Sequence, residues 1–281
     1  MKIHLAQSAG FCFGVKRAID IALKTVASSK NVYMLGDIVH NEDVVRKIQL
    51  AGIKKIKKLA KGVGKILLIR AHGSSPEIFQ KASRMGYQIF DATCPMVKEI
   101  HHIAKKMEEA GFQVIIIGDR KHDEVQGVAG QLTQEALIID SATRLPVKKL
   151  RSIKKACVVV QSTQNFQEVQ KIIVRIKAHI KNVKFFNTIC RPTRLKQQEI
   201  RALPRKNDVM IIIGSKHSAN TKRLFEISRS LNPRTYWVNS KNDIRKEWFV
   251  GAHSVGITAG ASTPDETTQE IIRYLKTIRQ A

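Results

Sequence analysis

Three of the four cysteines in the chain share one spacing to a glycine that ends an apolar run. In each case the glycine follows 24 residues after the cysteine (36 − 12, 118 − 94 and 214 − 190). This interval indicates a threefold internal repeat, so the three thiols occupy equivalent places and can meet on one axis. Three thiolates at one point suggest a metal ion or a metal cluster. The cysteines with this spacing are Cys12, Cys94 and Cys190.

Each of these cysteines stands just before a segment with helical periodicity. The predicted helices cover residues 14–28, 96–110 and 193–203. A helix N-terminus stabilises a thiolate, because its N–H groups carry partial positive charge. For a single cysteine, a small buried apolar role is the competing interpretation. We assign that role to Cys157, which opens an apolar run and has no counterpart in the repeat.

The wide spacing of the three cysteines argues against a structural zinc site. They lie 82 and 96 residues apart (94 − 12 and 190 − 94), whereas structural zinc usually takes paired Cys-x-x-Cys ligands in a closed set of four. An iron–sulfur cluster held by three thiolates would leave one iron open. Such an iron can act as a Lewis acid on a substrate oxygen.

Polar residues recur four and six positions after the three glycines, and again in a second loop of each repeat. Imidazoles, hydroxyls and an amide placed together at strand ends suit a phosphate or a diphosphate. A histidine taken alone is more often incidental, so the inference depends on the repeated placement. The recurring residues are His40, Glu42, His72, His122, Glu124, Ser162, Ser218, Asn220 and Ser262.

Glu124 is the strongest candidate acid in this set, because a carboxyl group in a closed site can hold or relay a proton. The competing interpretation is a glutamate that merely begins a helix. Asp43 and Asp123 are weaker candidates, since aspartates in such places often only cap helices.

Strands and helices alternate along the chain, and they must position these residues. Apolar runs end at the repeat glycines, and a second apolar run follows in each repeat, at residues 66–69, 157–160 and 255–257. Such alternation predicts parallel sheets with helices on their faces. Ligands of these sheets bind beyond the carboxyl ends of the strands. We therefore expect an α/β fold of three small modules around a shared centre.

The 281-residue chain carries a large excess of positive charge. Lysine and arginine number 49 against 23 acidic residues, which gives a net charge of +26. A nucleic-acid-binding protein is one interpretation, but aromatic residues make up only 6% and do not interleave with the basic ones as a stacking platform would. The other interpretations are a solvated basic surface and attraction of anionic substrates and acidic protein partners.

Several other classes of protein are disfavoured. No stretch approaches the roughly 18 uninterrupted apolar residues of a membrane span, and the first cysteine follows too soon after the N-terminus for a signal or transit peptide. Four cysteines without close pairing are typical of a reducing compartment. We expect a cytoplasmic protein that binds neither nucleic acid nor membranes.

At these residues the sequence resembles the 4-hydroxy-3-methylbut-2-enyl diphosphate reductase family of the non-mevalonate isoprenoid pathway. The resemblance covers about residues 1–275, nearly the whole chain. It rests on segments around the cysteines and the polar loops, at residues 10–15, 38–41, 70–73, 91–95, 122–125, 188–190, 214–220 and 258–262.

The resemblance implies a trefoil of three pseudo-threefold-related α/β modules around a central [4Fe–4S] cluster, one per chain. Each module would be a small, mostly parallel sheet flanked by helices. The implied modules are residues 14–95, 96–192 and 193–281, and we expect segment 1–13 to pack at the centre or on the third module.

The family's site residues carry over onto matching positions of this chain. Cys12, Cys94 and Cys190 would bind three irons, which leaves the fourth iron for the substrate's hydroxyl oxygen. Glu124 matches the proton-delivering glutamate of the family. The positions that match the diphosphate pocket are His40, His72, His122, Ser162, Ser218, Ala219, Asn220 and Ser262.

Two of these residues depart from the family pattern. Ser162 stands where many members have threonine, which keeps the hydroxyl group. Ala219 stands where many members have serine, so one hydrogen bond to the diphosphate is lost. That bond is worth about 1–3 kcal/mol because its acceptor is charged. We expect somewhat weaker substrate binding and no loss of activity.

The implied reaction is the reductive dehydration of an allylic alcohol diphosphate to isopentenyl and dimethylallyl diphosphate, with two one-electron transfers through the cluster. The chain shows no compelling dinucleotide-binding fingerprint. The resemblance therefore implies an external acidic electron donor such as a ferredoxin or a flavodoxin. Two alternatives stay open: a non-redox iron–sulfur dehydratase, and a basic nucleic-acid-binding protein whose cysteines hold zinc.

Overall fold

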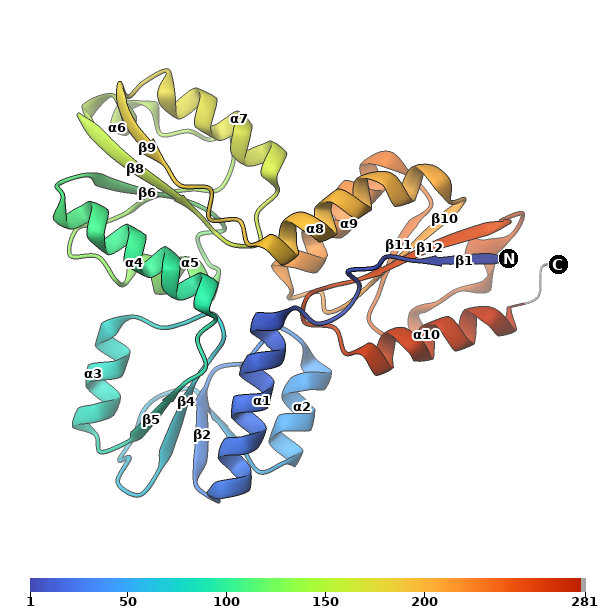
Figure 1. Ribbon diagram of the computed structural model, residues 1–281, viewed down its shortest axis with the longest axis horizontal. Coiled ribbons are helices and arrows are strands. Elements are labelled where there is room, and N and C mark those ends of the chain that lie inside the picture. The colour runs from blue at the N-terminus through green and yellow to red at the C-terminus, as the bar shows by residue number, and fades with distance from the viewer. Residues whose placement is uncertain (279–281) are drawn as a thin grey trace. The chain divides into compact units, whose positions relative to one another are not determined.

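Three separate four-stranded sheets form the framework of the computed structural model, which describes residues 1–278 (Figure 1). All neighbouring strands in the described chain run parallel. Contacts divide the chain into two compact units. One unit contains residues 17–38 and 48–190, and the other contains residues 1–16, 39–47 and the described part of 191–281. The predicted α/β fold of three small parallel sheets flanked by helices is confirmed.

The first sheet lies in the unit of residues 17–38 and 48–190. The apolar run 66–69 forms β4 as predicted, all four of its residues are buried, and strands pair with it on both sides. Helix α3 (Pro76–Arg84) connects β4 to β5. In spatial order the strands are β3 (Lys54–Ile56), β2 (Val32–Leu35), β4 (Ile66–Ile69) and β5 (Gln88–Asp91).

The second sheet belongs to the same unit and is covered on both faces. Helix α4 (Pro95–Glu109) packs on one face and α7 (Phe166–Lys177) on the other (Figure 1). Helices α5 (Asp123–Ala129) and α6 (Val147–Ser152) complete this part of the chain. In spatial order the strands are β7 (Leu137–Ile139), β6 (Gln113–Ile117), β8 (Lys155–Val160) and β9 (Asn182–Phe185).

Cys157 confirms its predicted role in the core of this sheet. Its side chain is fully buried among apolar residues on the α4 face. Burial raises the pKa of its thiol to about 12. This cysteine therefore stays a neutral thiol and is no candidate for a thiolate ligand.

The third sheet lies in the other unit and joins the two ends of the described chain. Strand β1 pairs with β12, with Lys2 opposite Ser254. The sheet's spatial order is β1 (Lys2–Leu5), β12 (Ser254–Ala259), β10 (Val209–Ile213) and β11 (Thr235–Val238). Its helices are α8 (Arg191–Ala202), α9 (Ala219–Leu231) and α10 (Asp265–Thr277), with three short 3₁₀ helices at Leu203–Lys206, Lys241–Asp243 and Lys246–Phe249.

The boundary between the two units falls within two helices, α1 (Phe13–Ser28) and α2 (Glu42–Leu50), because the chain changes unit after Lys16 and after Lys47. The predicted module boundaries after residues 95 and 192 stay a prediction. Among residues 1–278, no helix combines the length and the apolar character that crossing a bilayer requires.

Candidate functional site

The three repeat cysteines are held by the same backbone hydrogen bond. Each cysteine N–H donates to the carbonyl oxygen two residues beyond the last residue of β4, β8 or β12. The threefold spacing in the sequence is thus matched by a local contact that recurs three times. The N···O distances are 3.0 Å from Cys94 to Ala71, 3.1 Å from Cys190 to Ser162 and 3.1 Å from Cys12 to Ala261.

A helix begins immediately after each of these cysteines. Cys94 is the N-cap of α4, and α1 and α8 start one residue after Cys12 and Cys190. Helix α8 starts earlier than predicted, at Arg191, because proline is well accommodated in the first turn of a helix. All three cysteines are outside disulfide bonds and half-buried. Accessible thiols at helix N-termini suit soft metal ions or an iron–sulfur cluster.

Glu124 is buried at the start of α5, with 2% of the residue exposed. One carboxylate oxygen accepts the Ser162 N–H at 2.6 Å, and the other accepts the Ser162 hydroxyl at 2.7 Å. Burial raises the pKa of Glu124, although both hydrogen bonds act to lower it. The carboxyl group therefore keeps its proton to a higher pH than an exposed glutamate would.

Two predicted histidines lie beside Glu124 in the same unit. His122 caps α5, and its Nδ1 accepts the Glu124 N–H at 3.2 Å. This bond leaves Nδ1 without a proton, so in the neutral ring Nε2 carries it and can donate. The His72 ring packs edge-on against His122, with centroids 5.5 Å apart and an interplanar angle of 82°. The fold thus brings the two imidazole rings together at the start of α5, the helix that also carries Glu124.

Asp123, a weaker acid candidate, forms an ion pair. Its carboxylate lies 2.6 Å from Arg70 Nη1. The same nitrogen would lie 2.8 Å from a Cβ atom added to Gly36, whose φ of +77° also favours glycine. Arg70 therefore links the ends of β2 and β4 to the start of α5.

The other unit carries the remaining predicted polar residues. The Ser262 hydroxyl donates to the His40 carbonyl oxygen at 3.0 Å. Ser218 caps α9, and Ala219 is the first residue of that helix. Asn220 is 4% exposed, yet neither its side-chain oxygen nor its nitrogen has a hydrogen-bond partner among the described residues. Such a buried amide is costly unless a ligand satisfies it, which suits an anion-binding role.

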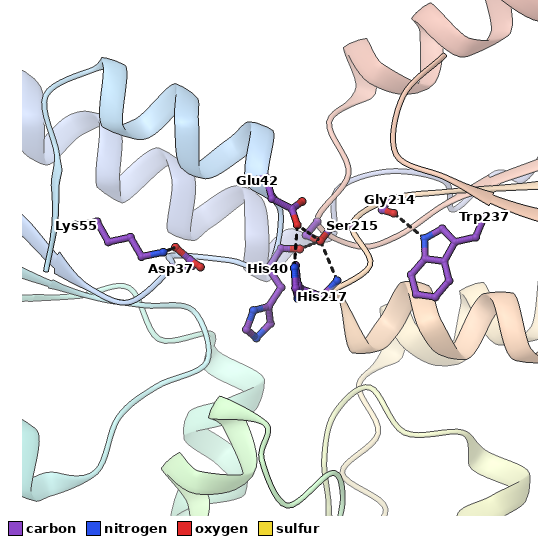
Figure 2. A network of polar contacts seen from close by, with 9 residues as sticks. Asp37, His40, Glu42, Lys55, Gly214, Ser215, His217 and Trp237 are labelled. Carbon is purple, nitrogen blue, oxygen red and sulfur yellow. Dashed lines mark hydrogen bonds and ion pairs between the residues drawn. The ribbon is translucent and has the colours of Figure 1, made fainter. Parts of the chain in front are cut away.

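Figure 2 shows a further polar contact in this unit, around Glu42. The Ser215 hydroxyl donates to Glu42 at 2.9 Å and accepts the His217 N–H at 3.0 Å, and His217 Nε2 lies 3.6 Å from the same carboxylate oxygen. Ser215 donates directly to the Glu42 carboxylate, so we interpret this contact as a structural link between the two residues and not as an activated serine nucleophile with its base. Glu42 occupies the repeat position of Glu124, but 53% of its side chain is exposed.

Residues that the sequence did not single out support these loops. The Gln161 side-chain oxygen accepts the Asp119 N–H at 2.8 Å, and its nitrogen donates to the Thr163 hydroxyl at 3.0 Å. Gln161 therefore fixes the loop after β6 against the loop after β8. In the sequence, the signal that could have identified Gln161 as a supporting residue was its position directly before Ser162.

The structure distributes the predicted residues between its two units. The assembly of all of them into one site stays a prediction. One unit contains Cys94, Cys190, His72, His122, Glu124 and Ser162, and the other contains Cys12, His40, Ser218, Ala219, Asn220 and Ser262.

Comparison with known proteins identifies relatives along almost the whole chain. The model of the family described as LytB protein matches residues 3–276. A protein named 4-hydroxy-3-methylbut-2-enyl diphosphate reductase from Geobacter metallireducens is 38% identical over 284 residues, which cover 100% of this chain and 99% of that protein. A protein of the same name from Aquifex aeolicus is 37% identical over 273 residues, with 96% and 94% covered.

Solved structures of similar proteins share the fold. A structure of (E)-4-hydroxy-3-methyl-but-2-enyl diphosphate reductase, described as the terminal enzyme of the non-mevalonate pathway, has a TM-score of 0.73 and 35% identity. It covers 98% of this chain and 99% of its own. The E-1-hydroxy-2-methyl-but-2-enyl-4-diphosphate reductase from Plasmodium falciparum has a TM-score of 0.89 and 27% identity, with 98% and 88% covered.

Proposed function

Because the chain belongs to the LytB protein family, we propose that it is an oxidoreductase that reduces 4-hydroxy-3-methylbut-2-enyl diphosphate to isopentenyl and dimethylallyl diphosphate. The family resemblance seen in the sequence is confirmed. The alignments with the two relatives that carry the reductase name include 99% and 94% of the length of those proteins. The reaction uses two electrons and two protons: one proton leaves with the substrate's hydroxyl group as water, and the other is added to the allylic carbon chain.

The buried carboxyl group of Glu124 is the observation that best supports this reaction. A hydroxyl group leaves easily only when it is protonated, and the raised pKa of Glu124 keeps a proton available. Ser162 binds both carboxylate oxygens and therefore orients this group. We thus assign proton delivery to Glu124 and its orientation to Ser162, in addition to the predicted place of Ser162 in the substrate pocket.

A [4Fe–4S] cluster fits the three repeat cysteines. Each cysteine is outside any disulfide bond, half-buried, followed by a helix and fixed by the same backbone contact. We propose that Cys12, Cys94 and Cys190 hold the cluster. When bound, it supplies single electrons and an open Lewis-acidic iron for the substrate's hydroxyl oxygen.

The diphosphate is an anion that needs several donors. The unsatisfied amide of Asn220 and the Nε2 side of His122 fit that requirement. We propose that the diphosphate pocket consists of His40, His72, His122, Ser162, Ser218, Ala219, Asn220 and Ser262.

The electrons must come from another molecule. A net charge of +26 favours rapid docking of an acidic redox protein such as a ferredoxin or a flavodoxin. We propose such a donor, and we place the reaction in the cytoplasm.

Visible absorption and metal content of anaerobically purified protein test the proposal. We expect a broad iron–sulfur absorption and about four irons and four sulfides per chain. Cys94→Ala should lose the cluster, whereas the control Cys157→Ala should retain it, because Cys157 lies in the apolar core. A colourless protein with stoichiometric zinc would refute the proposal.

A further inference from the structure

A lysine on α8 is completely enclosed by the protein. Lys196 is 2% exposed and belongs to the largest fully buried side chains among the described residues. A buried ammonium group is very costly unless acceptors surround it. Lys196 Nζ donates to the backbone oxygens of Ser8, of Gly10 at 3.0 Å and of Ala259 at 3.1 Å.

These three acceptors belong to the segment that leads into Cys12 and to the strand beside it. Residues 6–12 form no helix or strand, but they run alongside the end of β12 and the residues just after it. The N–H groups of Ala6, Gly10 and Cys12 donate to the oxygens of Ile257, Ala259 and Ala261 at 2.8, 3.4 and 3.1 Å. Lys196 binds the segment and the strand end together from α8.

Glu199 holds the same segment from the next turn of α8. Its carboxylate accepts the Ser8 N–H at 3.0 Å and the Ser8 hydroxyl at 2.6 Å. Lys196 binds the remaining polar group of Ser8, its carbonyl oxygen. The N–H, hydroxyl and carbonyl groups of Ser8 are therefore all bound by side chains of one helix.

We propose that Lys196, together with Glu199, is a positioning residue that holds Cys12 for ligation of the cluster. This inference rests on the proposed function. Helix α8 starts directly after Cys190, so the helix that follows one proposed ligand braces the segment before another. Without the ammonium group, three carbonyl oxygens lose a donor, two of them in buried contacts, and the segment before Cys12 has no regular structure to keep its shape.

The sharpest test compares three variants on the anaerobically purified, cluster-loaded protein. Lys196→Met removes the donors at similar length, and Lys196→Arg keeps a cation with enough donors for three carbonyls. Arg194→Met is the matched control, because it removes one charge from an exposed position of the same helix. Cluster loss to an iron chelator is followed by absorption, and amide hydrogen exchange is measured by mass spectrometry.

We expect Lys196→Met to release iron about tenfold faster or more, since even one charge-assisted hydrogen bond accounts for that factor. Exchange should accelerate in residues 6–12 and stay unchanged in β10. Lys196→Arg should release iron at a rate near that of the wild type, and Arg194→Met should behave as the wild type. If Lys196→Met does not fold, Glu199→Gln takes its place and should accelerate exchange at Ser8 and iron loss in the same way.

Three results would overturn the inference. Iron loss and exchange in Lys196→Met could match the wild type. Exchange could instead accelerate equally in residues 6–12 and β10, which would show general destabilisation without a specific role at Cys12. Glu199→Gln, where it is needed, could leave Ser8 exchange and iron loss unchanged. A wild-type protein that binds no iron would contradict the proposed function itself, which separates the two failures.

Discussion

At the scale of single residues, equivalent positions of the repeat differ in burial and in side chain. Glu42 and Glu124 stand six residues after their glycines, but Glu42 is half-exposed, whereas Glu124 is buried and bound twice by Ser162. The third equivalent is the buried amide of Asn220. Burial therefore distinguishes Glu124 as the proposed acid, because desolvation raises its pKa.

Replacing Glu124 by glutamine should nearly abolish turnover while the cluster stays bound. The amide keeps the shape of the side chain but has no acidic proton, and loss of general-acid catalysis costs about 10²–10⁴-fold in rate. The measurement is kcat under reducing conditions together with iron content. Wild-type turnover in Glu124→Gln would remove this residue from the mechanism.

Ser162 offers a graded control for the same role. Ser162→Ala removes one of the hydrogen bonds that lower the pKa of Glu124, so that pKa should rise further. The protonated form then survives to higher pH, and the alkaline limb of the pH–rate profile should move upward. Ser162→Thr keeps the hydroxyl and should leave the limb in place. An unmoved limb in Ser162→Ala would contradict this assignment.

Ala219→Ser should bind the substrate more tightly. The serine adds a hydroxyl at the first position of α9, where its charged acceptor would make the bond worth about 1–3 kcal/mol. The expected outcome is a lower KM with little change in kcat. An unchanged KM would argue against a role of this position in diphosphate binding.

Local sequence patterns predicted helices and strands well, but they did not predict contacts between residues far apart in the chain. Strand β4 coincides with the predicted residues 66–69, because four consecutive buried apolar residues leave a clear signal. The pairing of β1 with β12 left no local signal, since its partners lie at opposite ends of the chain, and only the family resemblance suggested that segment 1–13 packs at the centre or on the third module. Lys196 was missed for the same reason, because its acceptor Ser8 is 188 residues away and no periodicity marks it.

His101, like Lys196, is a helix residue whose structural role is visible only from its packing. It lies on α4, where its Cε1 atom would be 2.8 Å from a Cβ atom added to Gly73 and its Nε2 atom 3.6 Å from one added to Gly127. Burial lowers the pKa of His101 to about 4, with Asp91 raising and Lys98 further lowering it. Its neutral ring therefore links α4 to α5 and to the loop of His72.

This burial predicts a pH dependence of stability. The unfolded chain binds a proton at His101 with an ordinary pKa of 6.5, whereas the folded protein does so only near 4. The free energy of unfolding should therefore fall as the pH drops from 6.5 to 4, by about 3 kcal/mol when protonation is complete. His101→Gln should reduce this slope, and His102→Gln, at an exposed neighbour, should keep it. Equal slopes in the three proteins, measured by denaturant unfolding, would contradict the account.

At the scale of the whole molecule, the property with the clearest consequence for function is the net charge of +26. Attraction between a strongly basic protein and an acidic donor acts over the Debye length, which falls from about 30 Å at 0.01 M salt to about 3 Å at 1 M. The rate of reduction by an acidic redox protein should therefore decrease steeply with salt. Reduction by a small cationic mediator, reduced methyl viologen, should show the opposite slope, because salt screens its repulsion. A salt-independent rate with the acidic protein would show that the charge has no role in docking.

The central claim is that this chain performs a reduction on an allylic diphosphate. Its most direct test is conversion of 4-hydroxy-3-methylbut-2-enyl diphosphate by anaerobically purified, iron-loaded protein, with and without a one-electron reductant. We predict isopentenyl and dimethylallyl diphosphate only when the reductant is present. Conversion without reductant, or no conversion by iron-loaded protein with it, would contradict the account.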